Sequence, residues 1–488
     1  MTLFSIKKIL SLRKSDLVRN SFWGLAANIS QSVLLSLFYV ILARKYTTSD
    51  FSYFLIANSI YQFLATISNL GLGQWFTREI VSVDIGESIV NKFLKLQLYS
   101  GIGFYFINFL LAFTLYDNHE IRLLTMLLGI NIVFDNLIYV IKCLNIARSI
   151  QNVTFKIVIV DSVLKFMMVL LLLFFPFSIM TLSTGLICIR FLTLNLFLKY
   201  GSRKTLSLKL LLTYKISLNE VKKIVLANWP FLVIGSVSIV YWRIGNIIIS
   251  KMLSLLDVAV YEISFRIFSI FQILPIIISA SLFPRLVALY NSGDTIQFNV
   301  YYKKYISLFW IYGLFIYTFM YSLSKQIMPF VFGQKYLTAP AYTEQMFLTM
   351  LLFPTGMLQA TVLISMKLER IDMIINIISL IVSVALIWAG LSFIHSLTVV
   401  NISIFISFLV FHICQDYILV KRKVLTIKSV MNFYFFTAAF VTAYVLLAPR
   451  FQSIVFFMIV WGLAAVFTIT QRIKTGRSQA AIADTHTL

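Results

Sequence analysis

Residues 373–394 read MIINIISLIVSVALIWAGLSFI, a run of 22 residues without one charged side chain. A helix needs about 20 apolar residues to cross the roughly 30 Å hydrocarbon core of a bilayer, so this run is long enough to span it. With 60% hydrophobic and 12% charged residues, the chain has too few polar groups to coat a soluble protein of 488 residues. We therefore predict an all-α integral membrane protein with about 14 transmembrane helices. The other apolar runs cover residues 23–43, 51–76, 104–115, 123–141, 153–177, 179–198, 224–250, 258–283, 305–330, 341–366, 397–420, 430–447 and 454–470.

The 41 Lys and Arg residues indicate how these helices are oriented, because cytoplasmic loops carry the excess of basic residues. With the amino terminus inside, seven fall on the outer side, four within predicted helices, and the other 30 on the cytoplasmic side. Both termini are then predicted to lie in the cytoplasm. The seven outer residues are Arg44, Lys45, Arg122, Lys251, Lys325, Lys335 and Arg450.

Several function classes are disfavoured by composition and motifs. The net charge of +23 does not indicate nucleic-acid binding, because basic residues in alternate loops hold helix ends against anionic lipid head groups. The three cysteines lie in apolar runs without ligand spacing, which argues against disulfides and a metal site. Neither a phosphate-cradling GxxxxGK[ST] loop nor a nucleophile beside an orienting base is apparent. We expect no cofactor, and energy from a gradient of H⁺ or Na⁺, the membrane potential, the substrate gradient or another chain.

A fixed offset of 207 residues relates charged residues in the two halves of the chain. It matches Arg44 with Lys251, Asp50 with Asp257, and Arg78 with Arg285. We interpret this as a parallel repeat, with two six-helix lobes related by an axis along the membrane normal, and chance matching of loop residues is the alternative. The predicted divisions are an N-terminal lobe at 1–200, a cytoplasmic loop at 201–223, a C-terminal lobe at 224–423, and two further helices with a tail at 424–488.

Four cationic residues fall inside predicted helices, where each charge costs roughly 2.5–3.5 kcal/mol on insertion scales and therefore tends to face the protein interior. Two of them have an acid one helical turn away: Lys165 follows Asp161, and Arg266 follows Glu262. We predict that these are structural ion pairs.

The other two cations are Arg190 and Arg243, and Arg243 has no acid at pairing distance along its own helix. Arg243 stands beside amphipathic and polar residues, and we expect it to bind an anion. A planar guanidinium donates bidentately and stays charged, which suits phosphate. Arg190 lies nearer the cytoplasmic end, where extension to the head groups is an equally good interpretation.

Polar residues on the first two helices recur near helical spacing. Asn28, Gln31, Asn58 and Gln62 are candidates for a sugar-facing surface, and hydrogen bonding between helices explains them at least as well.

Three further residues are candidates for ion coupling. His412 and Asp416 are one turn apart on the predicted twelfth helix, and Asp135 stands at the middle of the fourth.

Several stretches resemble one known family in the right order over nearly 300 residues. They are DFSYF at 50–54, NLGLG at 69–73, RE at 78–79, YWRIGN at 241–246, VY at 260–261, FRI at 265–267, LFPR at 282–285, and FGQKY at 332–336 followed by Ala339. These stretches resemble the Wzx-type flippases, the polysaccharide transporter branch of the multidrug/oligosaccharidyl-lipid/polysaccharide exporter superfamily. One departure is Gly245, where the family commonly has an acidic residue.

The resemblance implies two lobes around a central cationic cavity, with Arg243, Arg266, Lys165 and Arg190 as candidates for binding a lipid diphosphate. It implies a flippase of the bacterial inner membrane that moves undecaprenyl-diphosphate-linked oligosaccharide units to the periplasmic leaflet by alternating access, for O-antigen, lipopolysaccharide or capsule synthesis. Membrane lipids, a polysaccharide polymerase and a chain-length regulator are the implied partners, and no nucleic acid. The alternatives are an ion-coupled exporter of drugs or organic cations on the same fold, or a membrane glycosyltransferase or polymerase of the same pathway.

Overall fold

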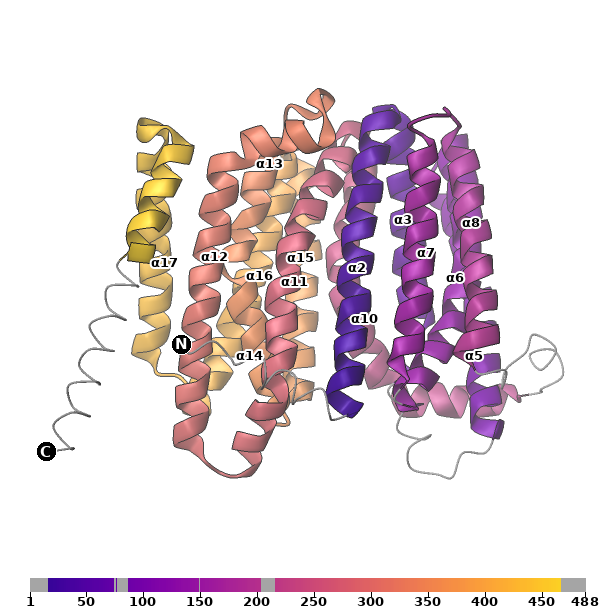
Figure 1. Ribbon diagram of the computed structural model, residues 1–488, viewed down its shortest axis with the longest axis horizontal. Helices are drawn as coiled ribbons and strands as arrows, with labels where there is room; N and C mark the ends of the chain where they lie inside the picture. The colour runs from indigo at the N-terminus through magenta and orange to yellow at the C-terminus, as the bar shows by residue number, and fades with distance from the viewer. Residues whose placement is uncertain (1–15, 74–75, 77–86, 149, 203–215, 467–488) are drawn as a thin grey trace, which may run out of the picture.

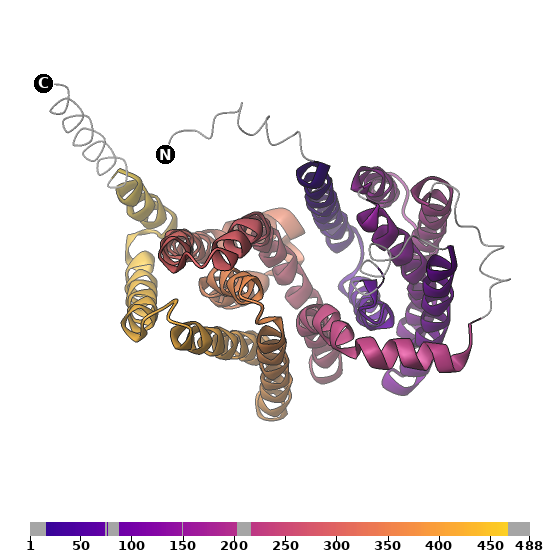
Figure 2. The same cartoon turned by 90° about the horizontal axis from the view of Figure 1, so that it is seen from below.

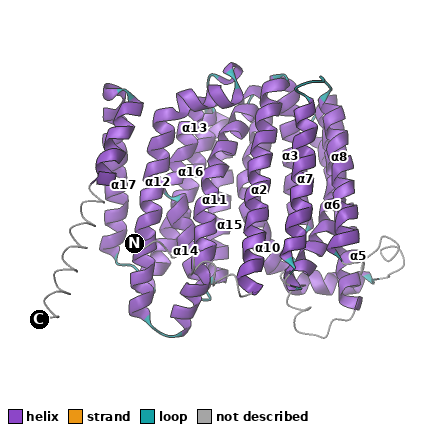
Figure 3. Cartoon of the chain, in the orientation of Figure 1, coloured by secondary structure: helices purple, strands orange, loops and turns teal. Residues whose placement is uncertain are grey.

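The computed structural model describes residues 16–73, 76, 87–148, 150–202 and 216–466. In these residues the chain is helical throughout and contains no strand (Figure 3). The helices stand roughly parallel to one another and form two groups, one from each half of the chain (Figures 1 and 2). We call α2 to α8 the N-terminal bundle: α2 Asp16–Lys45, α3 Thr48–Ser68, α5 Glu87–Leu115, α6 His119–Ala147, α7 Gln151–Leu171 and α8 Ile179–Leu196.

The C-terminal bundle follows, and two more helices pack on its far side. Its members are α10 Leu218–Met252, α11 Leu255–Asn291, α12 Thr295–Phe332, α13 Ala339–Met346, α14 Phe353–Ser365, α15 Glu369–Phe393 and α16 Leu397–Lys421. The appended helices are α17 Ile427–Leu447 and a helix over Ser453–Val466. Short turns of other helix types are η1 Phe197–Gly201, η2 Gln334–Tyr336, η3 Phe347–Leu351 and η4 Ala448–Phe451.

Within the described residues, each of the 14 apolar runs overlaps a helix or a helix pair. Nine helical segments in the described ranges are long and apolar enough to cross a membrane by length and composition alone. Helix α7, which is not among the nine, carries Lys156, Asp161 and Lys165. The predicted all-α membrane fold is confirmed.

Some helix boundaries differ from the predicted runs. Helix α3 ends at Ser68 instead of residue 76, because Leu70 and Gly71 take positive φ angles of 54° and 57° that no helix contains. The run 341–366 is divided into α13, η3 and α14, and Pro354 lies in the first turn of α14. Helix α5 begins at Glu87, well before residue 104, and its first half carries the polar side chains that hid it from a search for apolar runs.

Two helix starts that the 207-residue offset matches are built in the same way. Thr47 accepts a hydrogen bond from the backbone N–H of Asp50 and begins α3, and Ser254 accepts one from the N–H of Asp257 and begins α11. The preceding helices α2 and α10 also both end on basic residues, Arg44 and Lys251 among them. The division into two repeated lobes remains a prediction, and these equivalent ends support it; Arg78 lies outside the described residues.

The start of α10 lies within the predicted inter-lobe loop. Ser217 and Glu220 form a capping box, so the helix begins at Leu218, before the predicted boundary at 224; residues 203–215 lie outside the described part. Glu220 also pairs with Lys92 of α5 at 3.3 Å. The backbone N–H of Ser217 and the Lys92 ammonium lower the pKa of Glu220. Seen from below, the first turns of α10 run across the N-terminal bundle before the helix turns along the C-terminal one (Figure 2).

Helices α2 and α3 of the N-terminal bundle contact α10, α11 and α12 of the C-terminal bundle.

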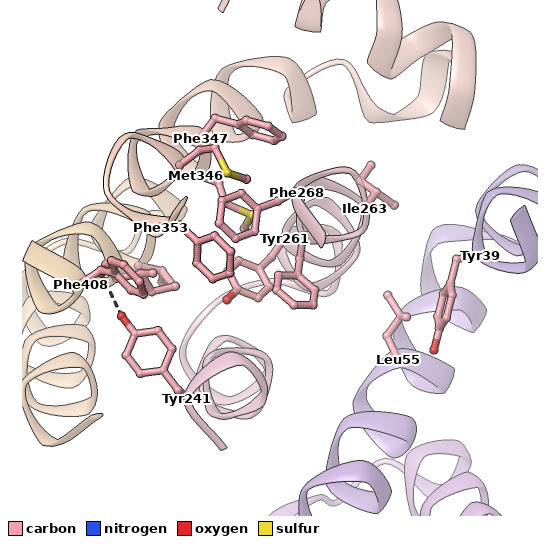
Figure 4. Packing of buried hydrophobic residues seen from close by; sticks show 14 of the residues in the cluster. Tyr39, Leu55, Tyr241, Tyr261, Ile263, Phe268, Met346, Phe347, Phe353 and Phe408 are labelled. Carbon is pink, nitrogen blue, oxygen red and sulfur yellow. Dashed lines mark hydrogen bonds between the residues drawn. The ribbon is translucent and has the colours of Figure 1, made fainter. Parts of the chain in front are cut away.

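In the C-terminal bundle, aromatic side chains pack closely: the ring of Phe268 contacts those of Phe347 and Phe353 edge-on, with ring centroids 5.4 and 6.2 Å apart (Figure 4). Helix α17 is fixed to α12, where the indole N–H of Trp310 donates to Thr437 Oγ1 at 2.8 Å. The packed aromatic core thus holds the helices that carry the C-terminal side of the cavity described next.

Candidate functional site

A cavity of about 440 Å³ lies between the two bundles. Helices α3, α6 and α8 form its wall on one side, and α10 and α11 form the other. Its lining residues are Tyr61, Gln62, Ala65, Thr66, Asn69, Asp135, Ile138, Tyr139, Lys142, Arg190, Trp242, Arg243 and Phe265. Three of these are cations and one is a carboxylate, so the cavity is predominantly positive.

Helix α6 presents one face to the cavity. Asp135, Ile138, Tyr139 and Lys142 follow the i, i+3, i+4, i+7 spacing that places residues on the same side of a helix. Lys142 was counted among the cytoplasmic residues because the predicted span ends at residue 141, whereas α6 continues to Ala147. The signal in the sequence that places Lys142 in the cavity is its spacing of two helical turns from Asp135.

A cluster of ion pairs stands behind the N-terminal wall. Arg190 pairs with Asp135, which also accepts a hydrogen bond from the Tyr61 hydroxyl, and with Asp161 at 3.5 Å. Lys165 pairs with the other oxygen of Asp161 at 2.8 Å, as predicted. The side chain of Asp161 is 2% exposed, so its negative charge has little contact with water and is stabilised by the paired cations instead.

A second cluster stands behind the C-terminal wall. Glu262 is buried on α11 and forms an ion pair with Arg266, one turn further along the same helix, as predicted. It also pairs with Arg243 of α10 at 3.3 Å. The amide of Asn246 donates to the same carboxylate at 2.6 Å. The Arg266 guanidinium lies over the ring of Tyr39 from α2, 3.6 Å from its centroid. Arg243 therefore does have an acid, contributed by the neighbouring helix, which the spacing along its own helix does not reveal.

The four cations expected to line a single cavity are divided by the structure. Arg243 and Arg190 line it, and Arg190 points inward to Asp135 instead of extending to the head groups. Arg266 is buried against Tyr39 and is not among the lining residues. Lys165 lines a separate small cavity of about 20 Å³. Arg266 and Lys165 thus lie outside the lining of the central cavity, and each is paired with the acid one turn away on its own helix; their role in substrate binding stays a prediction.

The candidate sugar-facing residues are likewise divided. Gln62 lines the central cavity, together with Thr66 and Asn69 one and two turns further along α3. Asn58 is buried and donates to the Tyr39 hydroxyl at 2.9 Å, so it serves as an interhelical bond. Gln31 lines the small cavity beside Lys165, and the side chain of Asn28 lies outside the described residues.

His412 and Asp416 lie in a different cavity, of about 360 Å³, between α12, α14, α16 and α17. His412 Nδ1 is 3.0 Å from Asp416 Oδ2, and the Tyr434 hydroxyl of α17 donates to the same carboxylate oxygen at 2.8 Å. The amide of Gln359 donates to Asp416 Oδ1 at 2.7 Å. The pair is thus enclosed in a network that ties α16 to α17. Asp135, the third coupling candidate, lines the central cavity. Its position in the sequence suggests an isolated acid, but in the structure it is paired with Arg190.

The charges in and directly behind the central cavity do not balance. Among the described residues there, the cations are Lys142, Lys165, Arg190, Arg243 and Arg266, and the acids are Asp135, Asp161 and Glu262. The excess is two positive charges. Lys142 has no carboxylate of the described chain at ion-pairing distance, so its ammonium is available to a ligand. An anion with two negative charges would neutralise the site, and no group of three or more metal-ligating side chains is found in the described ranges.

The fold and the cavity between two helical bundles define a multi-pass membrane protein with a transporter fold. The family model of polysaccharide biosynthesis proteins matches residues 41–341. The chain belongs to this family, and the resemblance predicted from its sequence is confirmed.

Solved structures share the fold at low sequence identity. The lipid II flippase MurJ in an inward closed conformation is 14% identical, with a TM-score of 0.70 over 92% of this chain and 99% of that one. An inward-facing multidrug resistance MATE transporter of the MOP superfamily is 14% identical, with a TM-score of 0.60 over 83% of this chain and 94% of that one. An outward-facing multidrug resistance MATE transporter of the MOP superfamily is 15% identical, with a TM-score of 0.59 over 85% of this chain and 97% of that one. No curated protein is significantly similar in sequence.

Proposed function

We propose that the protein is a flippase of the bacterial inner membrane for undecaprenyl-diphosphate-linked oligosaccharide units of a surface polysaccharide. One observation carries the proposal: a cavity between the bundles is lined by Lys142, Arg190 and Arg243, with two more positive charges than negative ones in and behind it. A diphosphate esterified at both ends carries about two negative charges, which matches this excess. Membership of the polysaccharide biosynthesis family supports the substrate class.

The cavity offers separate surfaces for the parts of such a substrate. Lys142 and Arg190 from the N-terminal bundle and Arg243 from the C-terminal bundle approach the diphosphate from both sides. Gln62, together with the other polar residues of α3, offers hydrogen bonds to sugar hydroxyls, and the Trp242 ring offers a flat apolar face. The polyprenyl tail stays in the bilayer between the bundles.

Translocation by alternating access follows from this geometry. Because the cations come from both bundles, the diphosphate draws them together, and release on the other side separates them again. Lipid flipping makes and breaks no covalent bond. An H⁺ or Na⁺ gradient is the proposed energy source. We propose that both termini lie in the cytoplasm, and that a polymerase and a chain-length regulator are the partners.

The proposal is tested in cells that lack this gene and receive it back as wild type, Arg243→Ala or Lys156→Ala. Lys156 is exposed on α7 and controls for the loss of a positive charge. We expect wild type and Lys156→Ala to restore surface polysaccharide, and Arg243→Ala, at equal abundance in the membrane, to leave lipid-linked units facing the cytoplasm.

A second measurement separates the proposal from drug export on the same fold. Purified protein should bind undecaprenyl diphosphate and not undecaprenol, which has the same tail without the charge. If surface polysaccharide is unchanged by the deletion and neither lipid binds, the flippase assignment is wrong. Export of an organic cation is the competing function; the excess of positive charge around the cavity disfavours it.

A further inference from the structure

The stretch FGQKY at 332–336 carries part of the family resemblance, but none of its residues lines the central cavity. It follows α12, which ends at Phe332, at the end of the bundle where α2 also ends (upper in Figure 1). Gly333 has a φ angle of +94°, a conformation that side chains with a Cβ rarely adopt, and no atom lies within 4 Å of its Cβ position. The glycine is therefore needed for the turn itself, which brings Lys335 and Tyr336 back toward the N-terminal bundle.

Two basic residues cross between the bundles at this turn. Arg44, in the last turn of α2, donates to the carbonyl of Val331 at 2.7 Å and to the carbonyl of Phe330. In the opposite direction, Lys335 donates to the carbonyl of Tyr46 at 2.5 Å, directly beyond the end of α2. We call Arg44 and Lys335, with the carbonyls that they bind, the inter-bundle latch.

The latch has a physical basis in the two helix ends. The last four carbonyls of a helix have no partner within it, and the helix dipole makes this end negative. In the latch, each helix end is therefore capped by a cation from the other bundle. Neither cation has a carboxylate partner in the described chain, so the latch does not require a buried acid to be protonated or solvated when it opens.

Further contacts join the bundles at the same end. The Ser52 hydroxyl donates to the carbonyl of Leu255 at 2.6 Å, and the hydroxyls of Tyr116 and Ser250 are 2.5 Å apart. The central cavity lies deeper: its α3 residues begin at Tyr61, well after the helix starts at Thr48. In the described part of the chain, these contacts hold the two bundles together at the end that carries the latch, and the central cavity lies further into the molecule.

We propose that the inter-bundle latch is the gate at the outer face, and that its opening is the step that exposes the cavity to that side. This inference rests on the alternating access of the proposed function but not on the identity of the substrate. In the closed gate, Arg44 and Lys335 hold the two bundles together by binding the backbone carbonyls at the ends of α12 and α2.

The test measures the gap between the bundles without any substrate. Spin labels are placed at His119 and Leu337, both exposed at the latch end, one on each bundle, in protein whose cysteines have been replaced. Distances are recorded by pulsed electron resonance in lipid nanodiscs. The latch variant is Arg44→Ala with Lys335→Ala.

The matched control is Arg450→Ala with Lys325→Ala, which removes two positive charges at the same end. Neither residue forms a hydrogen bond across the bundles in the described part of the chain. If the latch variant does not fold, Arg44→Gln alone removes the charge and keeps an N–H donor.

We expect the ratio of long to short distances to rise about tenfold in the latch variant, because hydrogen bonds that hold the bundles together are lost, and to stay at the wild-type value in the control. Equal distributions in latch variant, control and wild type would overturn the proposal. An effect of the same size in the control would overturn it too, because charge removal would then suffice. Either result leaves the binding of undecaprenyl diphosphate untouched, so failure of the latch is distinguishable from failure of the flippase assignment.

Discussion

Replacing Lys142 with methionine should weaken diphosphate binding and leave the fold intact. The ammonium lines the central cavity and has no carboxylate of the described chain at ion-pairing distance, so no buried acid loses its partner. Methionine keeps the length and apolar stem of the side chain. This residue is therefore the one cavity cation among the described residues whose removal separates binding from stability.

The magnitude follows from the bond that is lost. A hydrogen bond to a charged group contributes about 1.5–3 kcal/mol, equivalent to about 10- to 150-fold in affinity. Lys142 is partly exposed, so water screens its charge, and we expect the lower end, about a tenfold rise in the dissociation constant.

The assay compares wild type, Lys142→Met and Lys142→Arg for binding of undecaprenyl diphosphate in nanodiscs, with undecaprenol as the uncharged probe. Lys156→Met on exposed α7 is the control. Thermal unfolding is measured on the same samples. A change in affinity of less than about threefold, or an unfolding midpoint that falls as far as in a variant of a paired arginine, would refute the reasoning.

Four other predictions concern parts described above. Arg190→Ala leaves Asp135 and Asp161 without their guanidinium, so thermal unfolding should show a loss of about 3–5 kcal/mol, and an unchanged midpoint would contradict the ion cluster. Thr47→Ala and Ser254→Ala remove matching caps, and each should cost about 1 kcal/mol by the same measurement; clearly unequal losses would argue against equivalent helix starts. Gly333→Ala strains a residue at φ +94° and should cost about 1 kcal/mol while raising the long-distance population; no change in the distances would separate the turn from the latch. Because the pKa of Glu220 is lowered in the fold, its cap is fully present above the ordinary value of about 4.3 and is lost as pH falls through the lower folded value; hydrogen exchange at the start of α10 should accelerate there in wild type and not in Glu220→Gln.

The helices were predictable because each must present a long apolar surface to the bilayer, whatever its neighbours are. The same rule explains the misplaced boundaries. The first half of α5 carries polar side chains, some of them buried against other helices, and a search for apolar runs underrates such a segment. The end of α3 depends on two residues at positive φ, which hydropathy does not register.

The ion pairs of the site were predictable only where both partners share a helix. Asp161 with Lys165 and Glu262 with Arg266 follow from one-turn spacing, and both pairs are present. The partner of Arg243 comes from another helix, so the spacing along the sequence carries no record of it. Lys142 was missed for a different reason: the apolar run ends before the helix does, and a lysine at such an end is expected to face the head groups.

The two ion clusters behind the cavity have a consequence for the energy of motion. In the described chain, the cluster of Arg190 and Asp161 draws all its charges from the N-terminal bundle, and that of Glu262 draws all of its charges from the C-terminal bundle. Rocking one bundle against the other therefore separates no buried cation from its anion, a separation that would cost about 3–5 kcal/mol per pair. Between the bundles, the described contacts include hydrogen bonds of hydroxyls, carbonyls and one amide, the Arg266 guanidinium over the Tyr39 ring, and the two latch cations on backbone carbonyls. None of these contacts pairs a cation with a carboxylate, and water can take the place of each hydrogen-bond partner. The two bundles can thus move relative to each other within the membrane while every buried carboxylate of the two clusters keeps its cations.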